Sequence, residues 1–347
     1  MACETMIWRT VAALLLTGLL TAPVLPHQSD MASFTDDGEH HFFDEMMKHE
    51  ASEESSAKRP AAPSGTRLRW LWHDGRPRSY WLHIPPGYNG SSVPLVVVLH
   101  AGGGYPARMA DKTGFTEKAD EESFVVAYPR GVYRWAPWWR MWNGGYCCGV
   151  AYERDVDDVG FIKAMIGELR DSLAVNGSRV YVAGHSNGAI LTYRVAAELS
   201  DVVAAVGPVA GSIGGTASED SPLWVIPEPE HPVSIIHFHG RLDENVPYDG
   251  GHGNNTRGTG TDLPVNTSIA FWVGHNSCSR QPETWTSKSG NITRETYTGG
   301  DNGSEVTLYT IHNGGHGWPG SSMGDRPSQE LSATDVMWTF FQAHPKR

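Results

Sequence analysis

A five-residue motif, G-x-S-x-G at residues 184–188, constrains the fold of this chain more than any other feature. It stands between an apolar run, residues 180–183, and a helix-like run. So tight a turn from strand to helix forces the serine into a strained backbone conformation, and side chains two residues to either side would clash. Glycine at both places avoids the clash. The pattern predicts a strand, a sharp turn and a helix, with the Ser186 hydroxyl exposed above the sheet edge as a candidate nucleophile.

Apolar runs typical of buried strands alternate with helix-like stretches along the chain. The expected strands are residues 67–73, 79–84, 94–100, 122–128, 179–183, 233–239 and 306–312. The expected helices are residues 159–175, 188–199, 267–274 and 332–343. Asp74-Gly75, between the first two strands, is a hairpin signal. Strands that alternate with helices favour a mostly parallel sheet with helices on both faces, so the expected fold class is α/β.

A serine hydroxyl is a weak nucleophile at neutral pH and needs a general base, which in turn needs an orienting carboxylate. Asp243 and His316 each follow an expected strand, where parallel sheets place their sites. The chain order Ser186, Asp243, His316 is the order of an α/β-hydrolase fold. Glu244 and His312 are the alternatives for the acid and the base.

Negative charge that develops on an ester oxygen needs two preorganised N–H donors. The backbone of Asn187, the residue after the candidate nucleophile, should supply one of them. The other should come from the glycine-rich loop at residues 100–104, where Gly102 is the expected donor and a plain glycine turn is the alternative. These donors complete a candidate site for acyl transfer.

Five sequence blocks resemble secreted enzymes related to carbohydrate esterase family 1, namely feruloyl esterases, acetylxylan esterases and polyhydroxybutyrate-depolymerase-type esterases. The blocks are W-N-G-G at 142–145 with C-C-G at 147–149, V-D-D-V-G-F at 156–161, G-H-S-N-G at 184–188, H-G-x-x-D-x-x-V-P-Y at 239–248 and G-G-H-x-W-P-G at 314–320. The resemblance runs from about residue 95 to the C-terminus. It implies an α/β-hydrolase fold with Ser186, Asp243 and His316 as the triad. One departure is Ala101, where such proteins usually carry glycine.

Four further residues near these motifs are assigned by position. We expect Trp142 and Trp318 to bind substrate as part of an aromatic wall for the acyl group, with core packing as the alternative. Asp157 and Asp158 are expected to cap and anchor the following helix rather than to act in catalysis.

The N-terminal part differs from the rest of the chain. Residues 11–20 form an apolar run after Arg9, too short for a membrane span and typical of an export signal. Residues 26–65 are polar and acidic without a sustained period. We therefore expect a signal peptide at 1–25, a disordered acidic linker or pro-segment at 26–65, a catalytic domain at 66–347 and a secreted, extracellular protein. A single-pass or buried N-terminal helix is the alternative.

The formal net charge of −12 argues against nucleic acid and against an anionic membrane surface as partners. The expected partner is an ester substrate, polysaccharide-linked or oligomeric, and no cofactor is expected. His237 and His239 alternate on one expected strand and would face the same side, which could be half a metal site. We expect them to be structural and expect no metal.

The chain has four cysteines. Cys3 would leave with the signal peptide, and export permits disulfides among the remaining Cys147, Cys148 and Cys278. Because neighbouring cysteines bridge each other only with strain, we expect Cys278 to pair with one of the adjacent two. The working assignment is Cys148 with Cys278, and Cys147 is the alternative.

These observations favour a secreted serine carboxylic-ester hydrolase that acts on feruloyl or acetyl esters of plant polysaccharide. The aromatic-rich segment at 133–146 suits a planar acyl group or a sugar. The first alternative is a polyhydroxybutyrate-type polyester or oligomer depolymerase, which would usually add a binding module after the last helix, whereas this sequence ends at Arg347. The second alternative is a non-catalytic binding protein on a hydrolase scaffold, which would be expected to lack a triad member.

Overall fold

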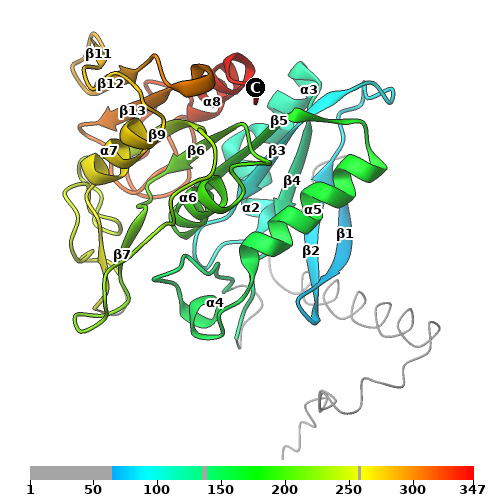
Figure 1. Ribbon diagram of the computed structural model, residues 1–347, viewed down its shortest axis with the longest axis horizontal. Coiled ribbons are helices and arrows are strands. Elements are labelled where there is room, and N and C mark those ends of the chain that lie inside the picture. The colour runs from blue at the N-terminus through cyan, green and yellow to red at the C-terminus, as the bar shows by residue number, and fades with distance from the viewer. Residues whose placement is uncertain (1–64, 135–138, 257–258) are drawn as a thin grey trace, which may run out of the picture. The chain divides into compact units, whose positions relative to one another are not determined.

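A ten-stranded sheet runs through the part of the chain that the computed structural model describes, residues 65–134, 139–256 and 259–347. The strand order is β1-β2-β4-β3-β5-β6-β9-β13-β12-β11 (Figure 1). The strands are β1 (Thr66–His73), β2 (Arg76–His83), β3 (Val93–Leu99), β4 (Val125–Pro129), β5 (Val175–His185), β6 (Ala205–Val209), β9 (Ser234–Gly240), β11 (Glu283–Thr286), β12 (Ile292–Tyr297) and β13 (Val306–Ile311). The expected signal peptide and all but the last residue of the expected linker lie outside the described residues.

The strands in the middle of the sheet are parallel, and the strands at both edges are antiparallel. The pairs β4–β3, β3–β5, β5–β6, β6–β9 and β9–β13 are parallel. The pairs β1–β2, β2–β4, β13–β12 and β12–β11 are antiparallel. In a parallel sheet all carboxyl ends lie at one edge, so the loops that follow β5, β9 and β13 lie at the same edge.

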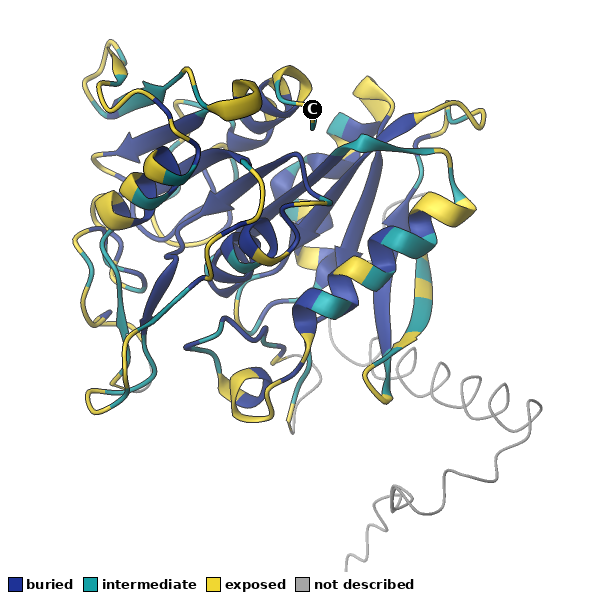
Figure 2. Ribbon diagram, viewed as in Figure 1, coloured by how far each residue is buried: buried dark blue, intermediate teal, exposed yellow. Residues whose placement is uncertain are grey.

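Buried apolar strands place the cores on both faces of the sheet. Every residue of β3 is buried, and its side chains alternate between two hydrophobic clusters. Leu95 and Val97 contribute to one cluster, and Val96 and Val98 contribute to the other. Figure 2 shows the central strands buried along most of their length, between helices that expose only their outer sides. The sheet is therefore the middle layer of three.

Helices cover both faces of the sheet. The cluster that contains Leu95 also contains residues of α5, α6 and α7, which lie on the near face in Figure 1. The cluster that contains Val96 also contains residues of α2, α3 and α8. The helices are α2 (Pro106–Thr113), α3 (Phe115–Glu122), α4 (Gly149–Glu153), α5 (Asp158–Ser172), α6 (Asn187–Glu198), α7 (Val265–His275) and α8 (Ala333–Ala343), with a short 3₁₀ helix η2 (Asp301–Gly303).

A second, three-stranded sheet has the order β10-β7-β8. It comprises β7 (Gly214–Thr216), β8 (Trp224–Val225) and β10 (Thr261–Asp262). β10 pairs with β7 in an antiparallel register that sets Asp262 opposite Gly215. In the described part of the chain, no helix combines the length and the apolar character needed to cross a membrane.

The expected α/β architecture is confirmed, and the predicted strands and helices lie close to β1, β2, β3, β4, β5, β9, β13, α5, α6, α7 and α8. The hairpin signal is also confirmed, because Asp74 and Gly75 join β1 to β2 with φ of 50° and 67°. Several elements were not predicted, namely the helices α2, α3, α4 and η2, the strands β6, β11 and β12 of the large sheet and all three strands of the small sheet.

Candidate active site

Ser186 lies at the sharp turn between β5 and α6. Its φ of 57° and ψ of −123° are strained values for a residue with a side chain, a cost of about 1–3 kcal/mol. The Ser186 N–H donates to the Val209 carbonyl of the neighbouring strand β6 at 2.9 Å, which holds the turn. A Cβ on Gly188 would come within 2.5 Å of the His100 carbonyl oxygen, and one on Gly184 would collide with the Gly188 carbonyl. The turn therefore requires both glycines, as the motif predicts.

Asp243 lies in the loop after β9, with its side chain fully buried. Its Oδ1 accepts hydrogen bonds from the backbone N–H groups of Asn245 at 2.8 Å and Val246 at 2.9 Å. Burial opposes ionisation of this carboxyl group, but the contacts with His239 and His316 outweigh it and hold the pKa of Asp243 well below its usual range. Asp243 is therefore a carboxylate at neutral pH.

His316 lies in the loop after β13, and its Nδ1 is 2.7 Å from Asp243 Oδ2. Because a carboxylate only accepts, Nδ1 carries the proton and leaves Nε2 as a proton acceptor. The ring of His185, the residue directly before Ser186, packs against the His316 ring with 4.9 Å between centroids. The structure thus brings the expected base to the serine turn and pairs it with the expected acid.

The alternative acid and base have other hydrogen-bond partners. Glu244 accepts a hydrogen bond from the Asn255 side chain at 3.1 Å, and His312 contacts Thr293 Oγ1 at 2.8 Å. Both contacts are solvent-exposed, as solvated loop residues would be. Of the candidates weighed in the sequence, the geometry joins only Asp243 and His316.

The two expected oxyanion donors lie next to each other. A Cβ on Gly102 would be 3.5 Å from Asn187 Cβ and 3.0 Å from Met141 Sδ. Within the described residues, neither the Gly102 nor the Asn187 backbone N–H donates to a protein acceptor. Both donors are therefore available to a substrate oxygen.

His100 holds the loop that carries Gly102. Its Nδ1 is 2.8 Å from the Ala101 carbonyl, and its Nε2 accepts the Gly131 N–H at 3.0 Å. Desolvation by burial lowers the pKa of His100 to about 3, so the ring is neutral and this one tautomer satisfies both contacts. The bond through the Ala101 carbonyl keeps the loop in place although Ala101 replaces the glycine of the family pattern.

Trp142 and Trp318 are core residues in this structure, so the expectation that they form an aromatic wall was wrong. Their side chains are 0 % and 1 % exposed. Trp142 Nε1 donates to the His100 carbonyl at 2.9 Å, and Trp318 Nε1 donates to Thr334 Oγ1 at 3.2 Å. Both indoles turn inward because each buried N–H finds its acceptor there. They support the site from behind instead of lining it.

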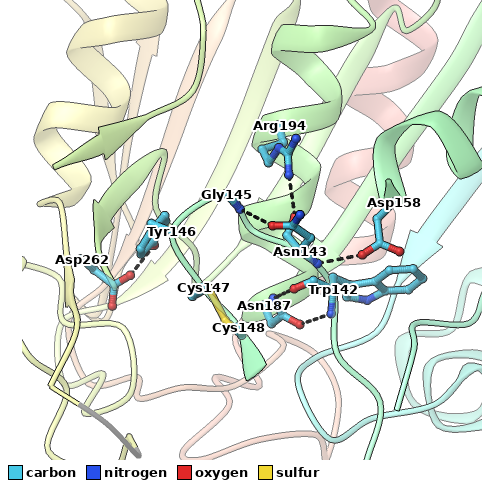
Figure 3. The surroundings of a disulfide bond; sticks show 10 residues. All are labelled: Trp142, Asn143, Gly145, Tyr146, Cys147, Cys148, Asp158, Asn187, Arg194 and Asp262. Carbon is cyan, nitrogen blue, oxygen red and sulfur yellow. Dashed lines mark hydrogen bonds between the residues drawn. A yellow bond between two sulfur atoms is a disulfide. The ribbon is translucent and has the colours of Figure 1, made fainter. Parts of the chain in front are cut away.

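The segment from Trp142 to Tyr146 is anchored on both sides (Figure 3). The Asn187 side chain pairs with the Trp142 backbone through bonds of 2.8 and 3.0 Å. The Asn143 N–H donates to Asp158 Oδ2 at 2.7 Å, and Asp158 Oδ1 pairs with Arg78 at 2.6 Å. The expected structural role of the two aspartates is therefore confirmed, since Asp157 also caps α5 by accepting the Gly160 N–H.

The disulfide joins Cys147 to Cys148, so the expected Cys148–Cys278 pair was wrong. Figure 3 shows the bond in the loop before α4. A Cβ on Gly144 would be 2.9 Å from Cys147 Sγ, which places the disulfide tightly against this loop. Cys278 is instead a buried thiol after α7, with its sulfur 3.8 Å from the Ser304 carbonyl. Cys278 therefore packs in a different part of the core.

A tyrosine–aspartate pair at the same loop was not predicted. Tyr146 donates its hydroxyl proton to Asp262, on β10 of the small sheet (Figure 3). Burial raises the pKa of Asp262 to about 6, and the charges of His239, Asp243 and His316 also act on it. Because the two residues are 116 positions apart and neither belongs to a motif, no sequence signal joins them.

His237 and His239 do face the same side of β9, as expected, but their rings hydrogen-bond to each other at 2.9 Å. Across the described residues, no group of three or more His, Cys, Asp or Glu side chains could hold a metal ion.

Comparison with known proteins identifies relatives among esterases. Residues 78–231 match the family described as esterase PHB depolymerase. A putative esterase, NocK, from Nocardia uniformis subsp. tsuyamanensis is 30 % identical over 292 residues, which cover 80 % of this chain and 81 % of that protein. Feruloyl esterase B from Piromyces equi is 28 % identical over 249 residues, which cover 71 % of this chain but only 44 % of that protein.

Solved structures share the fold at low identity. The acetyl xylan esterase from Aspergillus awamori superposes with a TM-score of 0.52 at 16 % identity, covering 79 % of this chain and 99 % of that one. A structure described as native sOPH gives a TM-score of 0.53 at 18 % identity, covering 83 % and 91 %. With the sheet order and the serine turn, these likenesses establish an α/β-hydrolase fold.

Proposed function

This chain belongs to the esterase PHB depolymerase family and is a carboxylic ester hydrolase, and we propose that it is a secreted serine esterase that removes feruloyl or acetyl groups from plant polysaccharide. The observation that carries the serine assignment is the 2.7 Å bond between His316 Nδ1 and Asp243 Oδ2 at the loop edge where Ser186 stands. This bond leaves His316 Nε2 as a proton acceptor for the serine.

The proposed reaction has two steps, acylation of Ser186 and hydrolysis of the acyl-enzyme, and His316 carries the proton in both. Ser186 Oγ attacks the ester carbonyl carbon while His316 Nε2 takes the hydroxyl proton. His316 then returns that proton to the departing alcohol, which leaves an acyl group on Ser186. Water attacks the acyl-enzyme by the same route and releases the acid. The N–H groups of Gly102 and Asn187 donate to the oxyanion of each tetrahedral intermediate.

Aromatic surface beside the oxyanion loop supports a planar acyl group or a sugar as substrate. Trp139 is 48 % exposed, and a Cβ on Gly103 would be 3.3 Å from its ring. Trp139 belongs to the aromatic-rich segment at 133–146, of which residues 135–138 are outside the described part of the chain. We propose that Trp139 contacts the substrate, in the role that the sequence suggested for Trp142 and Trp318. Several relatives are named as feruloyl esterases.

Labelling with a fluorophosphonate tests the nucleophile. The wild-type protein should be labelled, the Ser186→Ala variant should not, and Ser172→Ala, a change on the outer face of α5, should be labelled like the wild type. Label that persists in Ser186→Ala would refute the assignment. Fusing residues 1–25 to a reporter protein tests export, since retention of the reporter inside the cell would contradict the proposed secretion.

A second candidate is a depolymerase that acts on polyesters or their oligomers. The family description supports it, and a poly(3-hydroxyalkanoate) depolymerase C from Paucimonas lemoignei is 31 % identical over 134 residues. Parallel assays with methyl ferulate, acetylated xylan and 3-hydroxybutyrate oligomers separate the candidates. Preference for the oligomers, expressed as kcat/KM, would replace the polysaccharide assignment.

A further inference from the structure

Three buried side chains form a hydrogen-bonded row that leads to the Asp243 carboxylate. Tyr193 comes from α6, and His237 and His239 come from β9. Tyr193 Oη is 2.8 Å from His237 Nδ1, and His237 Nε2 is 2.9 Å from His239 Nδ1. His239 Nε2 is 2.8 Å from the Val246 carbonyl oxygen. All three side chains are closed off from solvent, since none is more than 1 % exposed.

With neutral rings, the direction of each hydrogen bond in this row follows from the Val246 carbonyl at its end. A carbonyl oxygen only accepts, so His239 Nε2 carries a proton, and in the neutral imidazole Nδ1 then accepts. His237 Nε2 must then donate to His239, which leaves His237 Nδ1 to accept the Tyr193 hydroxyl proton. Burial lowers the pKa of His237 well below its usual value and raises the pKa of Tyr193 above its usual value, so both groups are neutral as this pattern requires.

The row ends at the catalytic carboxylate. His239 Nε2 is 3.4 Å from Asp243 Oδ2, the same oxygen that accepts the His316 Nδ1–H at 2.7 Å. The Val246 backbone is held at two points, because its N–H donates to Asp243 Oδ1 while its carbonyl accepts from His239. The orientation of the carboxylate therefore depends on the position of the His239 N–H.

We propose that His239 is a positioning residue for Asp243, and that Tyr193 and His237 hold His239 in the one tautomer that can do this. None of the three touches the substrate, and each acts through the Asp243–His316 pair. The proposal rests on Asp243 being the triad acid. It predicts that loss of the donor at His239 lowers kcat and leaves KM unchanged, since a misplaced carboxylate affects the transition state and not substrate binding.

Two substitutions at His239 distinguish the roles of its two ring nitrogens. In His239→Gln the amide nitrogen reaches the place of Nε2, so the donor to Val246 and Asp243 is kept. In His239→Asn the amide lies at the place of Nδ1, so that donor is lost. We expect kcat to fall roughly 10- to 100-fold in His239→Asn, the usual size for groups that orient a catalytic ligand, and less than about fivefold in His239→Gln. Equal activity of the two variants would overturn the role of His239.

The far end of the row is tested with Tyr193→Phe, which keeps the ring that stacks on His237 and removes the hydroxyl. The matched control is Tyr128→Phe, which removes a buried hydroxyl with a 2.8 Å bond to Thr116 on the other face of the sheet. Tyr193→Phe should lower kcat roughly fivefold, and Tyr128→Phe should not change kcat. An unchanged kcat in both variants would overturn the roles of Tyr193 and His237.

Proton NMR provides a measurement that does not depend on the overall stability of the variants. The His316 Nδ1–H in its short bond to Asp243 should keep its downfield resonance in His239→Gln and lose or shift it in folded His239→Asn. An unshifted resonance in His239→Asn contradicts the positioning role. Asp243→Asn serves as the reference: if it keeps full activity, the proposed triad fails, whereas if it is inactive while His239→Asn is fully active, only the positioning role fails.

Discussion

The imidazole of His185 stacks on the ring of His316, with 4.9 Å between the centroids and 36° between the ring planes. His185 is the residue between Gly184 and Ser186, so the serine turn itself supplies this packing. Desolvation by burial lowers the pKa of His185 to about 3. The ring is therefore neutral at ordinary pH and adds no charge beside the proposed base.

Replacing His185 by leucine should make the protein less sensitive to acid. The unfolded chain binds a proton at His185 below about pH 6.5, while the folded chain does so only near pH 3, so folding loses stability as the pH falls through this window. At pH 5 this group costs about 2 kcal/mol relative to pH 7. Urea unfolding at pH 7 and pH 5 should therefore show a drop in unfolding free energy that is about 2 kcal/mol smaller in His185→Leu than in the wild type.

The wild type and His185→Leu differ only at this residue, so the contributions of all other titrating groups to the pH dependence of stability cancel in the comparison. Burial raises the pKa of Asp262 to about 6, so its contribution has the opposite sign and is lost as the pH rises through 6. This contribution is common to both proteins. An identical pH dependence in the wild type and His185→Leu would show that His185 is not kept neutral by the fold.

Gly102→Ala should lower kcat without a matching change in KM. The new Cβ would lie 3.0 Å from Met141 Sδ, so either the Met141 side chain or the loop must shift, and we expect part of the shift to move the Gly102 N–H away from the oxyanion position. Loss of one such donor costs about 100- to 1,000-fold in kcat, and partial displacement should cost roughly tenfold. Gly87→Ala is the control, because a Cβ there meets nothing within 4 Å. Equal kcat in both variants would argue against Gly102 as a donor.

The serine turn and the central strands could be predicted because their signals are local. Both glycines around Ser186 are required by contacts within a few residues of the turn or with the adjacent loop, and an unbroken apolar run such as β3 suits only a buried strand. The strand β6 was missed because it contains Gly207 and Pro208, which usually mark turns. The edge strand β11 is exposed along its whole length and so shows no apolar alternation.

Side-chain direction and long-range pairing could not be read from the sequence. Trp142 belongs to one of the sequence blocks that resemble the esterases, but its indole turns to the His100 carbonyl and away from solvent. The Tyr146–Asp262 pair depends on the approach of the small sheet to the loop before α4, which no motif encodes. The cysteine assignment failed for the same reason, since Cys278 packs beside Ser304 in the three-dimensional structure.

Asp158→Ala should destabilise the protein and lower kcat at the same time. The substitution leaves the Arg78 cation buried without its partner, at a cost of about 3–5 kcal/mol. It also removes the acceptor of the Asn143 N–H, which frees the segment that pairs with Asn187. The double variant Arg78→Met/Asp158→Leu should regain most of the unfolding free energy but not kcat. Full recovery of kcat in the double variant would show that the Asn143 anchor does not matter for the site.

Mapping the three cysteines of the described residues should find one disulfide among them, within the peptide that contains Cys147 and Cys148. That peptide should be lighter by two hydrogens without reductant, and Cys278 should carry the alkyl group after alkylation in denaturant. In the folded protein Cys278 should react slowly, because burial raises the pKa of its thiol to about 11 and the thiolate is the reactive form. A cross-linked peptide that contains Cys278 would contradict the structure and restore the pairing expected from the sequence.

Trp139→Ala should raise KM for feruloyl esters several-fold and leave kcat within about twofold, because the indole would contribute binding energy equally in the ground state and the transition state. The effect should be smaller for a small acetyl ester, which offers no aromatic face to stack on Trp139. Trp285→Ala is the matched control, since Trp285 is equally exposed at 48 % but lies on the edge strand β11. If both variants leave KM for methyl ferulate unchanged, Trp139 does not contact the acyl group. If KM rises only for acetylated xylan, Trp139 binds the sugar side of the ester instead.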